Sequence, residues 1–250
     1  MKKHIFLLLG IAMLFFAPVL RAQQDLGGSY NLEFSKKLTK QLGVSLEGEY
    51  RTRNNMRSTE RFMSSVAVDY KFNNFIKTGV DYTLINLDAL ENKFGDWEIR
   101  HRWSAFLTLY KKVGRVEFAL REKYQQTYRQ GVPATEWSPT FNRDEAEWEY
   151  SIKERANPKK VLRTRLQATW DIRKCKFEPY ASVEFFHLLN DPVNHGVGRV
   201  RYTIGTDYKL TKNDKLTLFY RNNNELTTNR SGEEEDPNSH YIGVGFTHKF

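Results

Sequence analysis

The chain has 250 residues, of which 28% are charged, and a formal net charge of +9 with a mean hydropathy of −0.65. Its one cysteine, Cys175, excludes an intramolecular disulfide. No linker rich in proline, glycine or serine divides it, so one domain is expected. Its basic residues alternate with apolar ones and form no exposed stripe beside stacking aromatics, which argues against nucleic acid as a partner.

The first segment predicts a secretory signal peptide over residues 1–22. It has a basic start, an apolar run over residues 5–20 and a small residue, Ala22, at the expected cleavage point. The alternative is a membrane anchor, but this run is short for a spanning helix. No cysteine lies near the cleavage point, so a lipoprotein anchor is not expected. The remaining residues, 23–250, are predicted to form one barrel domain.

From residue 28 onward the dominant pattern has period two, which predicts β-strands. In the stretch VGRVRYTIGTDYKL, for example, Val200, Tyr202 and Ile204 are separated by polar residues. After this first segment, no run of apolar residues approaches the ~20 that a membrane-spanning helix needs. The alternation predicts about eleven strands, near residues 30–34, 42–50, 62–72, 76–84, 99–109, 116–124, 162–172, 177–185, 200–210, 216–220 and 242–250.

The connections alternate in length, which predicts an up-and-down barrel of about 10–12 antiparallel strands. Short turns separate every second pair of strands, and longer polar loops, the longest near residues 129–158, separate the others. Bacterial barrels favour even strand numbers. We therefore expect either a further strand in the long loop or a first segment that does not cross. Both chain ends are expected at the short-turn side, which is periplasmic in bacterial barrels.

Alternation alone does not show which face of the barrel contacts water, because apolar and polar residues also alternate along the strands of a lipocalin-like soluble barrel. Several observations favour an apolar face in contact with lipid. The polar positions contain many charges, and the strands are long enough to cross a hydrocarbon band of about 25 Å. An apolar interior of eleven strands would be too wide to fill. Aromatic residues also gather near the short-turn side, as in an interfacial girdle: Tyr70, Phe72, Trp170, Tyr208 and Phe250.

Four segments together suggest a family. FEPYASVEFF (177–186), RVRYTIGTDYKL (199–210), LTLFYR (216–221) and the aromatic last strand resemble the uncharacterised outer-membrane barrel family called domain of unknown function 2490. The resemblance implies a Gram-negative outer-membrane location, contact with lipid and lipopolysaccharide, and no established activity or catalytic residues. Phe250 separately resembles the signal by which the barrel-assembly machinery recognises its clients, so that machinery is an expected partner.

The polar positions of the strands predict a charged lumen whose outer half is rich in arginine. One interpretation is a narrow, porin-like channel that favours small anionic solutes. The other is a non-conducting structural or adhesive barrel whose arginines pair with carboxylates and plug the lumen. The candidate anion contacts are Arg51, Arg61, Arg100, Arg102, Arg163, Arg165, Arg199, Arg201 and Arg221, and the candidate counter-charges are Glu47, Glu49, Glu98, Glu117 and Glu184.

A barrel-embedded lipid or peptide hydrolase is a lesser alternative. Acyl transfer needs a histidine beside a carboxylate and a serine, but His101, His187 and His248 fall at predicted lipid-facing positions, and none forms a known spacing. His195 and Asp191 share an outer loop. The acidic loops 144–149 and 232–237 are expected to be solvated surfaces with no bound metal. No cofactor motif is present, so no cofactor is expected.

Overall fold

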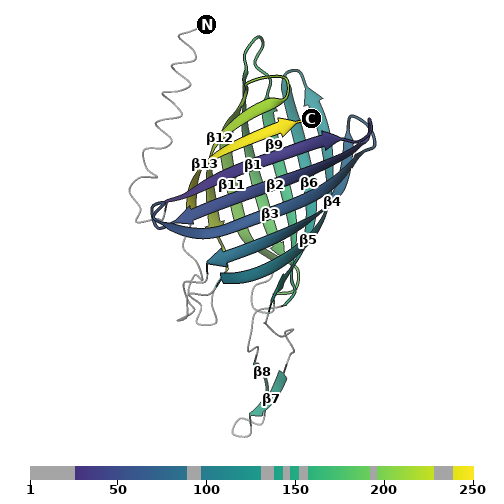
Figure 1. The fold of residues 1–250 in the computed structure, drawn as a ribbon. Helices are drawn as coiled ribbons and strands as arrows, with labels where there is room; N and C mark the ends of the chain where they lie inside the picture. Colours follow the sequence, from purple (N-terminus) through teal and green to yellow (C-terminus); the bar gives the residue numbers. More distant parts are fainter. Residues whose placement is uncertain are drawn as a thin grey trace.

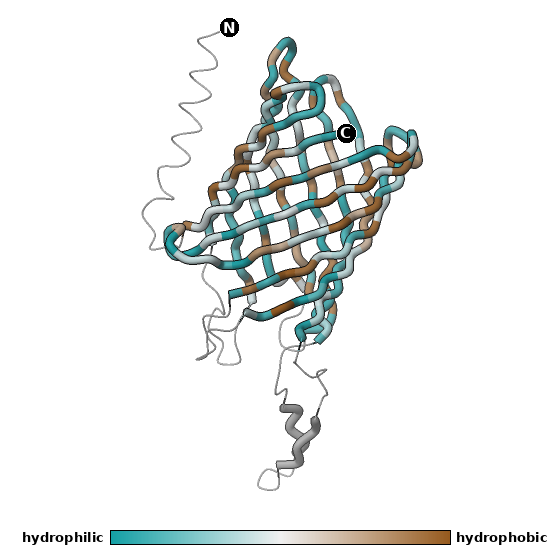
Figure 2. Tube along the Cα trace, in the orientation of Figure 1, coloured by the Kyte–Doolittle hydropathy of each residue, from teal (hydrophilic) through white to brown (hydrophobic). Residues whose placement is uncertain are grey.

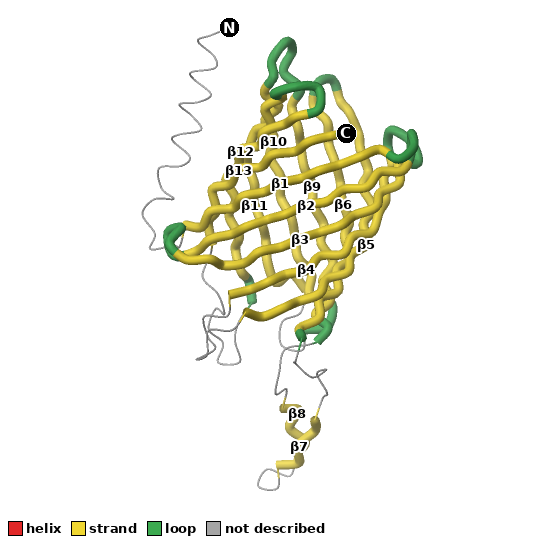
Figure 3. The backbone as a smooth tube through the Cα atoms, in the orientation of Figure 1, coloured by secondary structure: helices red, strands yellow, loops and turns green. Residues whose placement is uncertain are grey.

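The computed structural model describes residues 26–88, 97–130, 138–142, 147–151, 157–191, 196–227 and 239–250. Within these residues the chain is all-β, and eleven of its strands form one closed barrel (Figures 1 and 3). No helix in the described part is long and apolar enough to cross a membrane. The strands are β1 (Leu26–Lys37), β2 (Leu42–Arg53), β3 (Ser58–Lys71), β4 (Ile76–Asp88), β5 (Trp97–Val113), β6 (Val116–Arg129), β7 (Ser138–Asn142), β8 (Glu147–Ser151), β9 (Lys159–Trp170), β10 (Phe177–Leu188), β11 (Gly196–Lys209), β12 (Asp214–Glu225) and β13 (Ser239–Lys249).

The barrel closes between its first and last strands. β1 pairs with β13 in parallel, from Leu26 opposite His240 to Ser35 opposite Lys249. Every other neighbouring pair in the barrel is antiparallel. Closure leaves none of these strands with a free edge, so their backbone N–H and C=O groups are paired without water.

The odd strand number corrects two expectations. The long loop contributes no barrel strand among the described residues, because β7 and β8 form a separate two-stranded sheet. The first segment does cross, as β1. Since β1 and β13 run in the same direction, Leu26 lies at the rim of the longer loops and Phe250 at the rim of the short turns. The described chain therefore begins and ends at opposite rims, and the expectation that both ends share one rim is wrong. Residues 1–22 lie outside the described part.

The outer face of the barrel is apolar, as the alternation predicts. Large side chains such as Leu32, Val66, Val80 and Trp103 are between 51% and 59% exposed, and hydrophobic and hydrophilic residues alternate along the strands (Figure 2). A water-soluble protein rarely exposes a continuous apolar surface of this extent. The barrel is therefore of the transmembrane type.

Aromatic residues gather on the outer face near the rim of the short turns, which we call the short-turn rim. The Tyr70 and Phe72 rings meet edge to face at 4.9 Å, and those of Phe177 and Tyr208 lie 4.7 Å apart. Phe250 is 69% exposed. Rings with one apolar and one polar environment suit the boundary between lipid and water.

The inner face is partly filled by large side chains placed over glycines. A Cβ at Gly243 would lie 2.0 Å from the Phe219 ring, and one at Gly79 would lie 2.6 Å from the Phe106 ring. Only a residue without a side chain fits beneath these rings. Glycine at these positions therefore lets aromatic residues occupy the lumen.

Candidate functional site

The candidate site is the charged lumen. The nine predicted arginines all lie on barrel strands. Ion pairs that span intervening strands place their own residues on the inner face. Lys123 of β6 lies 2.6 Å from Asp81 of β4, with one strand between them, and Arg221 of β12 lies 3.6 Å from Glu49 of β2, with two strands between them. Such contacts are possible only on the concave side of the sheet.

A single carboxylate, Glu184, holds three arginines. Its side chain is only 3% exposed, and its oxygens lie 2.8 Å from Arg163, 3.3 Å from Arg121 and 3.5 Å from Arg201. We call these four residues the Glu184 cluster. The strand register places Arg201 of β11 directly opposite Glu184 of β10. On the other side Glu184 faces Arg165 of β9, and Arg163 lies two residues further along the same strand. The cluster has an excess of two positive charges.

Phe186 offers the arginines of this wall a second kind of contact. The guanidinium carbons of Arg163, Arg201 and Arg199 lie 4.6, 4.8 and 5.5 Å from the centre of its ring. Cations are attracted to the negative face of an aromatic ring. Arg199 also forms an ion pair with Glu225. Phe186 therefore orders the arginines without neutralising them.

A second cluster lies on the opposite wall. Glu49 accepts hydrogen bonds from Arg51 Nε at 2.5 Å and from Ser29 Oγ at 2.8 Å, in addition to its contact with Arg221. Here two arginines share one buried carboxylate.

A β-bulge adds a carboxylate next to this second cluster. The register between β2 and β3 shifts after Arg51, so that Glu60 is an extra residue. Its carboxylate pairs with Arg61 and accepts a hydrogen bond from Tyr241 Oη at 2.9 Å. Arg51 lies 5.6 Å from the centre of the Tyr241 ring. Bulges commonly redirect side chains in this way.

The remaining predicted residues are less closely joined. Arg100 forms a bidentate pair with Glu98, at 2.7 and 2.8 Å. Arg102 donates to Thr127 Oγ1 at 3.1 Å and forms no ion pair among the described residues. Glu47 faces inward on β2, also without an ion pair in the described part of the chain. The structure therefore groups some predicted charges and leaves others apart.

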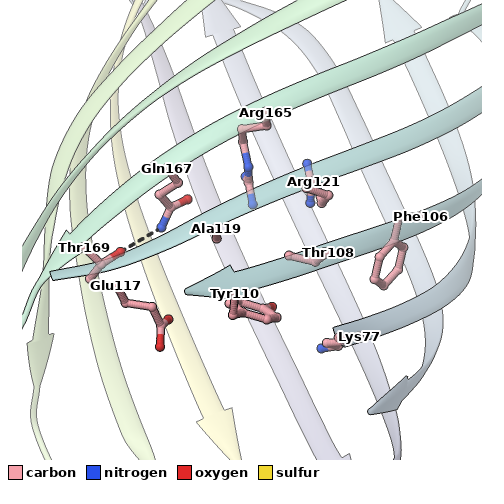
Figure 4. A pocket seen from close by; sticks show the side chains of 10 residues that line it. All are labelled: Lys77, Phe106, Thr108, Tyr110, Glu117, Ala119, Arg121, Arg165, Gln167 and Thr169. Atoms are coloured by element: carbon pink, nitrogen blue, oxygen red, sulfur yellow. Dashed lines mark hydrogen bonds between the residues drawn. The ribbon is translucent and has the colours of Figure 1, made fainter. Parts of the chain in front are cut away.

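A cavity of about 270 Å³ opens inside the barrel toward the short-turn rim (Figure 4). Strands β4, β5, β6 and β9 line it. Its wall combines basic, aromatic and amide side chains with one carboxylate, that of Glu117. The lining residues are Lys77, Phe106, Thr108, Tyr110, Glu117, Ala119, Arg121, Arg165, Gln167 and Thr169.

The profile of the family described as "Protein of unknown function (DUF2490)" matches residues 28–234. The chain belongs to this family. The match covers ten of the eleven barrel strands in full or nearly so, and the last strand lies beyond it. A search of the curated proteins finds no match to this DUF2490 chain.

Among solved structures, the DUF2490 barrel is similar to a NanC porin, with 13% sequence identity, a TM-score of 0.49, and coverage of 91% of this chain and 100% of that one. It is also similar to the β-domain of the Bordetella autotransporter BrkA, with 13% identity, a TM-score of 0.42, and coverage of 82% of this chain and 78% of that one.

Arg121 and Glu60 are two charged residues of the DUF2490 lumen that are absent from the predicted set. Arg121 contacts Glu184 and lines the cavity, and alternation with Leu120 on β6 could have found it. Glu60 could not have been found in this way, because the bulge places it at the wrong parity. Alternation predicts which face a residue occupies only where the register is continuous.

The histidines of the outer face have structural partners. His101 Nδ1 lies 2.6 Å from Tyr82 Oη, and His248 Nδ1 lies 2.7 Å from Asp214 Oδ1. Within the described residues, no three His, Cys, Asp or Glu side chains could hold a metal ion together. His195 and the acidic loop 232–237 lie outside that part.

Proposed function

We propose that the chain is a narrow passive channel of a Gram-negative outer membrane that favours small anionic solutes. The apolar outer face and its aromatic rim support a place in lipid. The charge of the lumen supports the preference for anions, since fixed cations around a narrow path attract negative solutes and repel positive ones.

The observation that carries this proposal is the shortage of carboxylates beside the inner arginines. Three arginines share Glu184. Arg102 and Arg165, which face the same lumen, form no ion pair among the described residues. A solute that crosses therefore meets guanidinium groups whose charge is not neutralised by the protein. Guanidinium groups bind carboxylates and phosphates through paired hydrogen bonds.

A non-conducting barrel is the second candidate, and a specific observation favours it. Several contacts tie strands together across the concave face, among them Arg221 with Glu49, Lys123 with Asp81, and Tyr241 with Glu60. Side chains can fill the interior of a small barrel. Such a barrel would present its longer loops to partners at the cell surface.

Reversal potentials in planar lipid bilayers under a KCl gradient separate the two candidates. The channel proposal expects stepwise currents with a preference for chloride. The double variant Arg102→Glu, Arg165→Glu should shift that preference toward potassium. The control is Arg57→Glu, a single charge reversal in an exposed turn outside the lumen, to be compared with each of the two lumen reversals made singly. Absence of conductance, or a potassium preference in the unaltered protein, refutes the proposal.

The same proposal includes a biogenesis route. Residues 1–22 act as a signal peptide that is removed on export, leaving residues 23–250 as the barrel domain. The short-turn rim then faces the periplasm and the longer loops, including the one near 129–158, face outward beside lipopolysaccharide. Phe250, whose N–H donates to Ser35 O at 2.9 Å, ends the last strand as the signal for the barrel-assembly machinery.

A further inference from the structure

Two arginines of the cavity face each other directly. Arg121 of β6 and Arg165 of β9 are register partners on neighbouring antiparallel strands. Like charges at such positions destabilise a sheet because they repel at short range. A negatively charged group close to both arginines would offset this repulsion.

The protein supplies only a small part of that counter-charge. Arg121 reaches Glu184 through Nη2 at 3.3 Å, and its buried Nε has no hydrogen-bond partner in the described part of the chain. Glu184 lies closer to Arg163, at 2.8 Å. Glu184 also lies opposite Arg165 in the register, but Arg165 donates no hydrogen bond and forms no ion pair among the described residues, so one carboxylate serves all of these arginines.

The other charges of the cavity do not fill this role. Lys77 is already paired with Asp69 at 3.1 Å. Glu117 forms no ion pair with either arginine among the described residues, and in Figure 4 its carboxylate points away from Arg165. The two guanidinium groups therefore remain available to an anion that enters the cavity.

The rest of the wall indicates the kind of anion. The cavity of about 270 Å³ has the volume of roughly nine liquid waters, which is far more than a chloride ion needs. Phe106 and Tyr110 supply aromatic surface, and Ala119 adds a small apolar side chain to the same wall (Figure 4). Binding sites for organic molecules commonly combine apolar walls with a few polar groups that fix orientation.

We propose that this cavity is a binding subsite for a small organic carboxylate with an apolar or aromatic body. The carboxylate lies between Arg121 and Arg165, and its body lies against Phe106 and Tyr110. This inference deepens the proposed function, because the subsite would be a resting place on the anion path near the short-turn rim. Binding at this subsite requires the paired hydrogen bonds that a planar guanidinium group donates, whereas general attraction of anions requires only positive charge.

Benzoate is a suitable probe, with acetate, inorganic phosphate and benzyl alcohol for comparison. In calorimetric titrations of the folded barrel in lipid nanodiscs, benzoate should bind saturably, acetate and phosphate about tenfold or more weakly, and benzyl alcohol not measurably. In planar bilayers benzoate should reduce the chloride current with the same midpoint. Phosphate binding as tight as benzoate would overturn the requirement for an apolar body.

Three variants test the residues. Arg165→Gln should weaken benzoate binding about tenfold or more, the loss expected for charge-assisted hydrogen bonds. It should still fold, since it removes repulsion from Arg121. Arg165→Lys keeps the charge and loses the fork, so it should keep chloride preference and still weaken benzoate. The control, Lys215→Gln on β12, removes an inner positive charge outside the cavity and should leave benzoate binding unchanged.

The subsite proposal and the channel proposal can be refuted independently of each other. Saturable benzoate binding that is lost in Arg165→Gln, in a barrel that conducts nothing, would keep the subsite and refute the channel. An anion-selective conductance with no response to benzoate, and no heat of binding, would keep the channel and refute the subsite. Equal benzoate binding by Arg165→Gln and the unaltered protein would also refute it.

Discussion

The parallel closure of β1 on β13 can be tested with an engineered disulfide. Gly245 faces the lumen opposite Asn31 of β1, and a Cβ placed on it would lie 3.6 Å from the Asn31 Cβ. Disulfides need Cβ atoms about 3.5–4.5 Å apart. The double variant Asn31→Cys, Gly245→Cys, made in a Cys175→Ser background, should therefore cross-link without movement of the backbone.

The expected gain in stability follows from the length of chain that the bond encloses. A link from residue 31 to residue 245 closes a loop of about 215 residues, and the chain-entropy model gives about 5 kcal/mol for a loop of this size. Strain is small, because the other atoms near the added Cβ lie at ordinary contact distances of 3.4 and 3.9 Å. The oxidised barrel should resist urea and heat more than the reduced one.

The measurement is gel mobility without boiling, with and without reductant, together with urea unfolding in lipid vesicles. The control pair is Asn31→Cys, Thr247→Cys. Thr247 faces Glu33 in the observed register, so its Cα would be about 8 Å from that of residue 31, beyond the reach of a disulfide. This control would cross-link only if the register were shifted.

One outcome would refute the closure described above. Without β1, the last strand would meet β2, which runs in the opposite direction, and ten strands would close an antiparallel barrel of the usual even number. The Asn31→Cys, Gly245→Cys protein would then stay reduced while folding normally. Absence of the cross-link in a folded, heat-resistant barrel contradicts the parallel seam.

Three further predictions concern orientation, stability and assembly. The exposed Cys175 lies in a short turn, so a membrane-impermeant maleimide should label it only after the outer membrane is opened. Arg57→Cys in a Cys175→Ser background should instead be labelled on intact cells. The reverse pattern of labelling contradicts the proposed orientation. Glu184→Gln should lower the free energy of unfolding by about 3–5 kcal/mol, because a buried partner of three arginines is lost. Its control, Glu178→Gln, removes the partner of an exposed lysine and should lower the free energy of unfolding by less than about 1 kcal/mol. Urea unfolding monitored by tryptophan fluorescence compares the two variants. Deletion of Phe250 should reduce the amount of folded barrel in the membrane far more than it changes the conductance of the molecules that do insert, and equal amounts of inserted protein would argue against an assembly signal.

The faces of the barrel could be predicted from the sequence because a strand has a side-chain period of two. Val200 and Tyr202 alternate with Arg199 and Arg201, and that alternation survives folding wherever the strand is regular. Alternation therefore predicts an inner position for Arg201, which in the structure lies 3.5 Å from the buried Glu184. The exception, Glu60, lies at a bulge, where one extra residue reverses the parity.

The parallel seam could not be predicted in the same way. Counting strands gave an odd number, and the preference for even numbers then suggested that one strand was missing or misplaced. Local sequence patterns do not predict that β1 pairs with β13, because this pairing joins residues more than 200 positions apart. The rim at which Leu26 lies follows from the local β1–β2 hairpin, whose short turn over residues 38–41 places the start of β1 at the other rim.

The candidate anion subsite depends on register more than on composition. A slip of one residue between β6 and β9 is opposed because it would turn charged side chains toward lipid. A slip of two keeps every residue on its face, but it would place Arg121 opposite Arg163 or Gln167 and no longer opposite Arg165. The same residues could thus give a lumen with a different arrangement of charge. The facing arginines of the cavity are a property of the paired strands, and any variant that disturbs their register should lose benzoate binding while keeping its net charge.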